Sequence, residues 1–304
     1  MSDLTPSVFV NPFTDFGFKK LFGTEYNKDL LIAFLNALIE PASPIVDLTY
    51  LNNEQLGRSE QDRKAVYDVY CKTQDGSRFL VEMQRTAQKF FKDRSVYYTT
   101  FPISHQGLKG ETWNYELKDV YAVGVLNFSF DEEHPDDPRS TVKLAVQETG
   151  QVFYNKLTMI FLEMPKFKKK LEELQTDYDR WLYVLKNLTR LSERPTALSS
   201  KIFQKLFEQA RIAAFTQVEA LDYQNSIKNL RDNYSQLWSA EEKGRDEGRA
   251  EGRAEGRAEG LAEGIEKGSE QKAREDAKKM KDKGYPIADI AEITGLSEDE
   301  IKKL

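Results

Sequence analysis

KAVYDVYCKTQDGSRFLVEMQ, from Lys64 to Gln84, is the segment that decides the fold. Runs rich in Val, Tyr and Phe flank an Asp-Gly pair, and this combination predicts a β-hairpin. A three-residue loop with Gly76 in the left-handed conformation would place Asp68 opposite Glu82. A two-residue loop would instead mix Asp68 into the apolar face, which burial opposes, so we favour the first register. That register gives one wholly apolar face, made of Tyr67, Val69, Cys71, Phe79, Val81 and Met83.

The favoured register makes Asp68 and Glu82 direct cross-strand neighbours. Their Cβ atoms would lie roughly 5 Å apart, a spacing at which like charges destabilise a sheet. A divalent cation is the simplest compensation, because hard ions such as Mg2+ bind carboxylates and water, and two carboxylates that share a site do not both ionise cheaply. The alternative is a solvated face on which nearby cations neutralise both acids: Lys64, Lys72, Arg78 or Arg85.

The composition bounds the class of protein. The chain has 304 residues, 39% of them apolar and 31% charged, which indicates a soluble globular protein of about two domains. The longest apolar run, Leu30 to Leu35, is too short to span a bilayer, and the MSDLTP start has no secretory pattern. We therefore expect no membrane partner.

The scarcity of cysteine and histidine limits the chemistry. The single cysteine, Cys71, predicts a reducing, cytoplasmic location. With this thiol and two histidines, His105 and His134, the chain has too few parts for structural zinc or a His-based nucleophilic triad. Carboxylates, amides, Lys or Tyr must carry any reaction. The net charge of −6 counts against a broad DNA-binding surface but leaves room for a local basic patch.

Helices and further strands are expected around the hairpin. Thr14 or Asp15 could N-cap a helix that ends at Gly23, and helical patterns follow at 27–39 and 89–109, the latter bent or split by Pro102. Asp15 is a candidate functional acid next to the apolar side of this helix, and the alternative is that it only caps the helix. Strand patterns cover 44–51, 120–130, 141–154 and 157–163. We divide the chain into a core (1–165), a helical region (166–240), a charged repeat (241–270) and a small ending (271–304).

Glycine recurs at every fourth residue from Gly244 to Gly268. Each glycine costs a helix up to about 1 kcal/mol relative to Ala, and like charges stack along the repeat without Arg–Glu pairs at helical spacing. A second copy could approach closely over the glycines and match its Arg row to the other Glu row. The sequence therefore predicts either a homodimer through Gly244–Gly268 or a flexible charged linker.

The ending pairs two short helices around a glycine-containing turn. Ser297 and Glu300 form a capping box for the last helix. The arrangement is compatible with a helix-turn-helix DNA reader, although many small helical pairs with this pattern bind no DNA.

Several motifs together resemble the PD-(D/E)XK nuclease-like transposase family, also called recombination-promoting nucleases. The resemblance covers about 11–167. Its motifs are Asp15 with Phe18-Lys19-Lys20-Leu21-Phe22, Tyr67-Asp68-Val69, Asp75-Gly76, Val81-Glu82-Met83-Gln84, Leu126-Asn127-Phe128 and Phe161 to Phe167. The resemblance implies an α/β (α+β) fold with a mixed sheet flanked by helices.

The same resemblance implies site residues and a reaction. Asp68 and Glu82 would ligate Mg2+ (or Mn2+), Asp15 would supply the acid of the first helix, and Gln84 would stand where many superfamily members have lysine. A neutral amide orients water but adds no positive charge, and Lys19 or Lys64 could substitute. The implied function is metal-dependent hydrolysis of DNA without a small-molecule cofactor, linked to recombination or mobile elements. The alternative is a catalytically weak or inactive DNA-binding or assembly protein on the nuclease scaffold.

Overall fold

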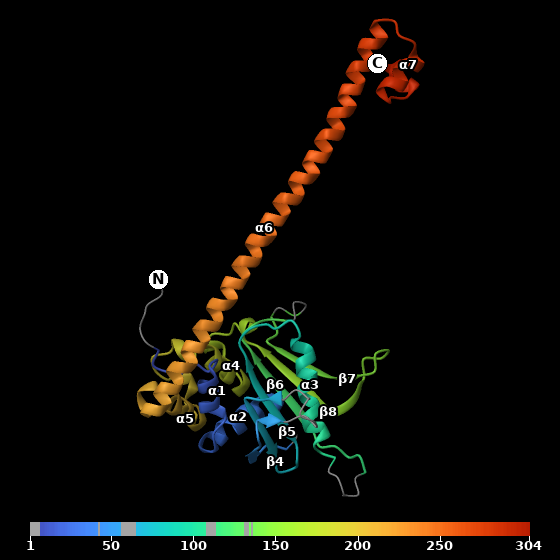
Figure 1. Cartoon of the computed structure of the whole chain (residues 1–304). Coiled ribbons are helices and arrows are strands. Elements are labelled where there is room, and N and C mark those ends of the chain that lie inside the picture. Colours follow the sequence, from blue (N-terminus) through green and yellow to red (C-terminus); the bar gives the residue numbers. More distant parts are fainter. Residues whose placement is uncertain (1–6, 42, 56–64, 108–113, 131–133, 135) are drawn as a thin grey trace. The chain divides into compact units, whose positions relative to one another are not determined.

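A mixed sheet forms the centre of the first part of the chain (Figure 1). The computed structural model describes residues 7–304 apart from 42, 56–64, 108–113, 131–133 and 135. Within these residues the sheet has the strand order β1-β4-β5-β6-β8-β7, and β2 and β3 form a separate pair. The strands are β1 Leu48–Tyr50, β2 Glu54–Gln55, β3 Ala65–Val66, β4 Val69–Thr73, β5 Arg78–Gln84, β6 Val120–Leu126, β7 Arg139–Ala145 and β8 Val152–Glu163.

The hairpin of β4 and β5 has the predicted register. Cys71 pairs with Phe79 and Val69 with Val81, and Gly76 has a φ of +92°, in the region that glycine adopts without strain. β5 then pairs with β6 in parallel, and β6 with β8 in parallel, whereas β1 and β7 add antiparallel edges. The expected mixed α/β fold is confirmed.

Helices cover both faces of this sheet. One face packs on the apolar sides of α1 Asp15–Phe22, α2 Lys28–Ile39, α4 Asp177–Asn187 and α5 Lys201–Ala210. The other face packs on α3 Phe91–Ser104, whose Phe101 is buried against Tyr70 and Leu80. Because both faces are covered, the solvated hairpin face considered from the sequence is wrong.

The ends of α1 follow the sequence signals. Thr14 is the N-cap, since its side chain accepts a hydrogen bond from the Gly17 backbone N–H, and Gly23 is the C-cap. Capping therefore falls to Thr14, and Asp15 is the first residue of the helix.

Several features differ from the prediction. The expected strand over 141–154 is interrupted by a turn at Gly150, which has a φ of +68°, so β7 ends at Ala145 and β8 begins at Val152. Pro102 lies within the last turn of α3 and does not split it. Tyr67 packs with Tyr70 and Leu80 beneath α3 instead of joining Met83 on the opposite face.

The chain divides into two compact units, up to Leu230 and Arg231–Leu304. In the second unit the end of α6 (Gln217–Asp282), α7 Ile287–Thr294 and α8 Glu298–Lys303 share a core of Ala277, Ile290 and Ile301. The Ser297–Glu300 capping box is present. The glycine repeat is helical within α6, and the DNA-reading role of the ending stays a prediction.

Candidate metal centre

The site begins where β4 and β5 separate. Their pairing ends at Val69 and Val81, while β5 continues to pair with β6 as far as Gln84. The chain bends at Asp68, and the backbone N–H of Met83 donates a hydrogen bond to Asp68 Oδ2 at 2.8 Å. Asp68 thus satisfies a strand N–H that β4 leaves unpaired, and this bond holds its carboxylate beside Glu82. The predicted cross-strand pair of Asp68 with Glu82 therefore does not form. The Asp68 carboxylate instead accepts a hydrogen bond from the backbone of Met83.

Asn53 fixes this bend. Its Nδ2 donates to the backbone oxygen of Asp68 at 2.9 Å, and its Oδ1 accepts from the backbone N–H of Tyr70 at 3.2 Å. Its own backbone oxygen accepts from the N–H of Tyr67. These bonds replace the ladder hydrogen bonds that the strand loses at the bend. The sequence places Asn53 in a polar loop and carries no signal of this role.

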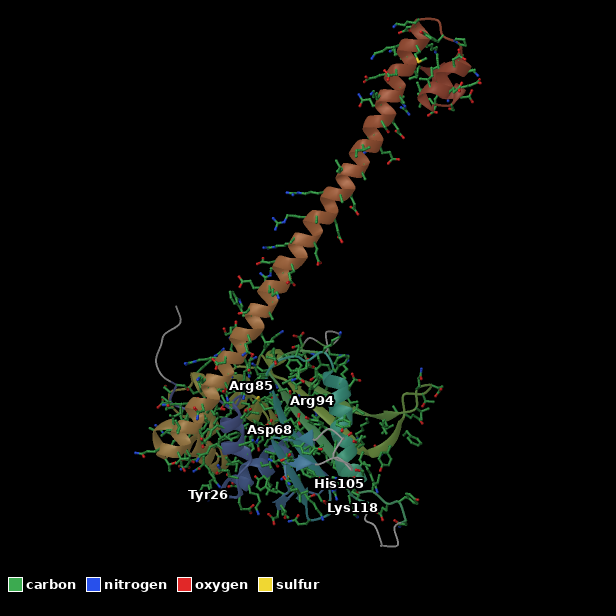
Figure 2. All side chains as sticks on the ribbon, viewed as in Figure 1. Tyr26, Asp68, Arg85, Arg94, His105 and Lys118 are labelled. Carbon is green, nitrogen blue, oxygen red and sulfur yellow. The ribbon has the colours of Figure 1, made fainter. Side chains whose placement is uncertain are left out.

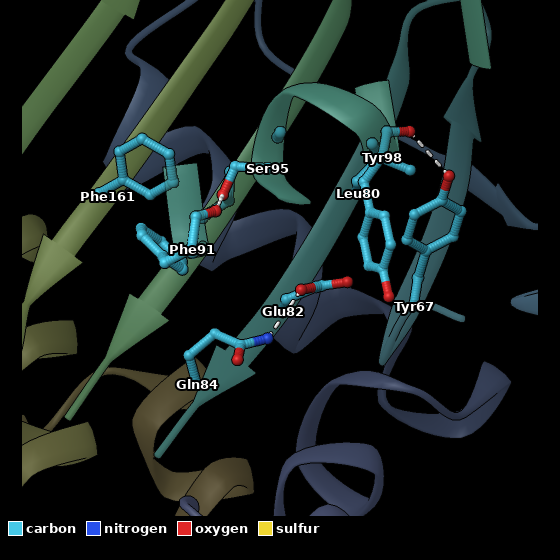
Figure 3. A pocket seen from close by; sticks show the side chains of 11 residues that line it. Tyr67, Leu80, Glu82, Gln84, Phe91, Ser95, Tyr98 and Phe161 are labelled. Carbon is cyan, nitrogen blue, oxygen red and sulfur yellow. Dashed lines mark hydrogen bonds between the residues drawn. The ribbon is translucent and has the colours of Figure 1, made fainter. Parts of the chain in front are cut away.

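Glu82 extends into a small cavity beneath α3, as Figure 3 shows. Its side chain is 16% exposed, and its Oε2 accepts from Gln84 Nε2 at 2.8 Å and from Arg94 Nη2 at 3.1 Å. Its Oε1 is buried and has no hydrogen-bond partner within the described chain. The cavity measures about 30 Å³, which is room for one water or a small ion. A buried carboxylate oxygen without a protein partner can accept a hydrogen bond from a water or bind a cation.

Burial controls the ionisation of both acids. The pKa of Glu82 is raised to about 7, mainly by burial and also by the Asp68 charge, while the Arg94 charge opposes the rise. Burial also raises the pKa of Asp68, against the stabilising hydrogen bond from the Met83 N–H. The negative charge of Asp68 disfavours ionisation of Glu82. The two carboxylates are therefore electrostatically coupled, as the hairpin predicted.

Arg94, which is labelled in Figure 2, forms an ion pair with Glu82. It comes from the second turn of α3, and its guanidinium lies 5.0 Å from the ring centroid of Tyr98, one helical turn further on. The sequence shows Arg94 only as part of a basic helix. Two of the cations suggested for neutralising the two acids have other partners: Arg78 binds the backbone oxygen of Pro102, and Arg85 pairs with Asp15. The charge of Arg85 nevertheless lowers the pKa of Asp68. Lys64 lies outside the described residues.

Asp15 lies at the margin of the site. Its Oδ1 is 2.6 Å from Arg85 Nη2, and its side chain is 64% exposed. Its charge raises the pKa of Asp68, while Lys19 and Arg85 lower it. Among the described residues no group of three or more acidic, His or Cys side chains gathers. The structure thus brings together Asp68, Glu82 and Gln84 and leaves Asp15 in an ion pair next to them.

A family model described as PD-(D/E)XK nuclease family transposase matches residues 12–240. The chain belongs to the PD-(D/E)XK nuclease family transposases. This membership supports a nuclease-type function related to mobile elements, in a family of enzymes that generally use divalent metal ions. No curated protein and no solved structure matched the chain.

The residues of this candidate site fit a divalent cation. Asp68 and Glu82 supply carboxylate oxygens, the donors that Mg2+ and Mn2+ prefer. The unpartnered Oε1 of Glu82 offers one ligand, and the amide of Gln84 and the guanidinium of Arg94 hold Oε2 in place. A bound cation would offset the coupled charges that raise the pKa of Glu82.

Two further properties of the described residues are the reactivity of Cys71 and the apolar character of the helices. Burial raises the pKa of the Cys71 thiol to about 12, so this cysteine is no ready nucleophile. In the part of the chain that the structure describes, no helix is both long and apolar enough to cross a bilayer.

Proposed function

We propose that this protein is a Mg2+- or Mn2+-dependent DNA endonuclease linked to recombination or mobile elements, with Asp68 and Glu82 as the metal ligands. The observation that carries the proposal is the buried, unpartnered Oε1 of Glu82 beside the coupled carboxylate of Asp68. Family membership supports the reaction class. The reduced state expected of Cys71 supports a cytoplasmic location.

The chain prepares this site before any ion binds. Asp68 is held by the Met83 N–H, and Glu82 is held by the Gln84 amide and Arg94. A bound ion would supply two effects: a lower pKa of a coordinated water and stabilisation of the leaving oxygen. Gln84 would orient that water through its amide, and Asp15 would take part once Arg85 releases it.

The test is nicking of supercoiled plasmid DNA in Mg2+ and in EDTA. We expect cleavage only with the metal, and its loss in Asp68→Ala with the fold retained. Glu172→Gln is the matched control, because it removes an exposed carboxylate from a 3-10 turn outside the site. Equal cleavage by Asp68→Ala and the parent protein would refute the assignment.

A second candidate function follows from the Arg94–Glu82 pair. Because Arg94 already compensates part of the charge of Glu82, the protein could bind DNA on a nuclease fold without cutting it. This candidate predicts DNA binding that is indifferent to Mg2+ and a melting temperature that Mg2+ does not change.

We also propose that the chain forms a homodimer through Gly244–Gly268. Each glycine of the repeat has open space where a Cβ would lie, so a partner helix could approach its backbone. Within the repeat, Arg245 pairs with Glu241, which precedes it, and the following Arg side chains lie exposed. Sedimentation of the full chain measures the oligomeric state.

A further inference from the structure

A basic pocket lies next to the candidate metal centre, in the first unit. It measures about 230 Å³ and has a polar and cationic lining that includes Arg85, Asn127, Lys186 and Arg190. None of its described lining residues is acidic. The chain has a net charge of −6, but Arg85, Lys186 and Arg190 line one pocket together. They form a local basic patch of the kind that the composition does not exclude.

The pocket is built on the same strand ends as the site. Arg85 directly follows Gln84 at the end of β5, and the backbone N–H of Asn127, which follows β6, donates to the Gln84 oxygen at 2.9 Å. Met164 and Pro165 follow β8 and complete this edge. Because β5, β6 and β8 are parallel, their carboxyl ends meet here, the position where α/β sheets bind ligands.

The positive charge of the pocket is only partly compensated. Arg190 is exposed and has no ion-pair or hydrogen-bond partner in the described chain. Lys186 Nζ donates to the backbone oxygens of Pro165 and Phe167, which are neutral groups. Burial lowers the pKa of Lys186, and the Arg190 charge lowers it further. Arg85 alone has an acidic partner, Asp15. An anion would relieve this repulsion.

We propose that this basic pocket binds a backbone phosphate of the DNA strand that the metal centre cleaves, through Arg190, Lys186 and Arg85. The inference rests on the proposed function, because it names part of the same substrate. Guanidinium forks bind phosphate oxygens in pairs, and lysine adds a point charge. Glu82 and Arg85 are three residues apart on an extended chain, about 10 Å. Since each strand of duplex DNA rises about 3.4 Å per nucleotide along the helix axis, this separation corresponds to a span of about three nucleotides.

The experiment measures DNA affinity without cleavage. The full chain is titrated into a fluorescein-labelled duplex in EDTA, and fluorescence anisotropy gives the dissociation constant over a series of salt concentrations. Loss of one phosphate contact reduces the slope of log affinity against log salt by about 0.9. We expect this loss in Arg190→Gln, recovery in Arg190→Lys, and no change in Lys201→Gln, which removes an exposed charge of α5 that lines no part of the pocket.

Each outcome decides the inference. An unchanged slope in Arg190→Gln, or an equal loss in Lys201→Gln, overturns it. A phosphate-induced rise in melting temperature that Arg190→Gln removes, with the DNA slope unchanged, also overturns it, because the ligand is then free phosphate and not the DNA backbone. Failure of the nuclease proposal is distinguishable: plasmid cleavage would be absent in Mg2+ while the Arg190-dependent slope persists.

Discussion

Replacing Glu82 with glutamine should stabilise the protein at high pH. The ordinary pKa of 4.5 rises to about 7 in the fold, and this difference corresponds to about 3 kcal/mol. The side chain is 16% exposed, so solvent screens little of it. Because the folded state binds the proton more tightly, the free energy of unfolding falls as the pH rises from about 4.5 to 7, and the full penalty applies above pH 7. Glutamine is neutral at every pH and still accepts from Arg94.

Urea unfolding in EDTA at pH 4 and pH 8 measures this effect. We expect Glu82→Gln to match the parent at pH 4 and to exceed it at pH 8 by up to about 3 kcal/mol. The exposed control Glu172→Gln should change neither value. A Glu82→Gln protein that is less stable than the parent at pH 8 would refute the reasoning, because Glu82 would then stabilise the fold as an ordinary ion-pair partner of Arg94.

Three further substitutions probe other parts of the structure. Arg94→Met should raise the pKa of Glu82 above about 7, because it removes the opposing charge. The affinity for Mg2+, measured over a series of pH values, should then reach half its maximum at a higher pH than in the parent protein, and an unchanged midpoint pH would contradict this. Gly17→Ala should destabilise the protein by about 3 kcal/mol or more, since a Cβ there would lie 2.0 Å from the Asn11 carbonyl oxygen; thermal unfolding measures it, and a neutral result would show that α1 can shift. Combined Gly248→Ala, Gly252→Ala and Gly256→Ala should raise helicity by circular dichroism, at up to about 1 kcal/mol per residue, and should dissociate the proposed homodimer in sedimentation; a more stable dimer would show that the glycines do not form the contact.

The register of the hairpin could be predicted from the sequence. The Asp-Gly turn and the apolar alternation determine the register of β4 with β5, because any shift by one residue would bury charge. That register brings Asp68 and Glu82 close together, and the hydrogen bond from the Met83 N–H completes their coupling. Helix α1 was equally predictable, since Thr14 and Gly23 mark its ends.

The rest of the site depends on contacts between segments far apart in the chain. Tyr67 departs from the predicted alternation of side chains between the two faces, because β4 and β5 are no longer paired on the N-terminal side of Val69. Asn53 and the Asp68 carboxylate form hydrogen bonds in place of those that the ladder loses there. Arg94 meets Glu82 only once α3 lies across the sheet, and no local pattern encodes that packing. Arg85, which follows β5, likewise meets Lys186 of α4 and Arg190 in one pocket only after the parallel strands align.

The central claim is that Asp68 and Glu82 bind one divalent cation. Isothermal titration calorimetry of the full chain with Mn2+ and Mg2+ at pH 8 tests it most directly. We expect one saturable site per chain in the parent protein and in Glu172→Gln, and no site in Asp68→Asn or Glu82→Gln, the second of which should be more stable than the parent in EDTA. Unchanged metal binding by either site variant would contradict the account.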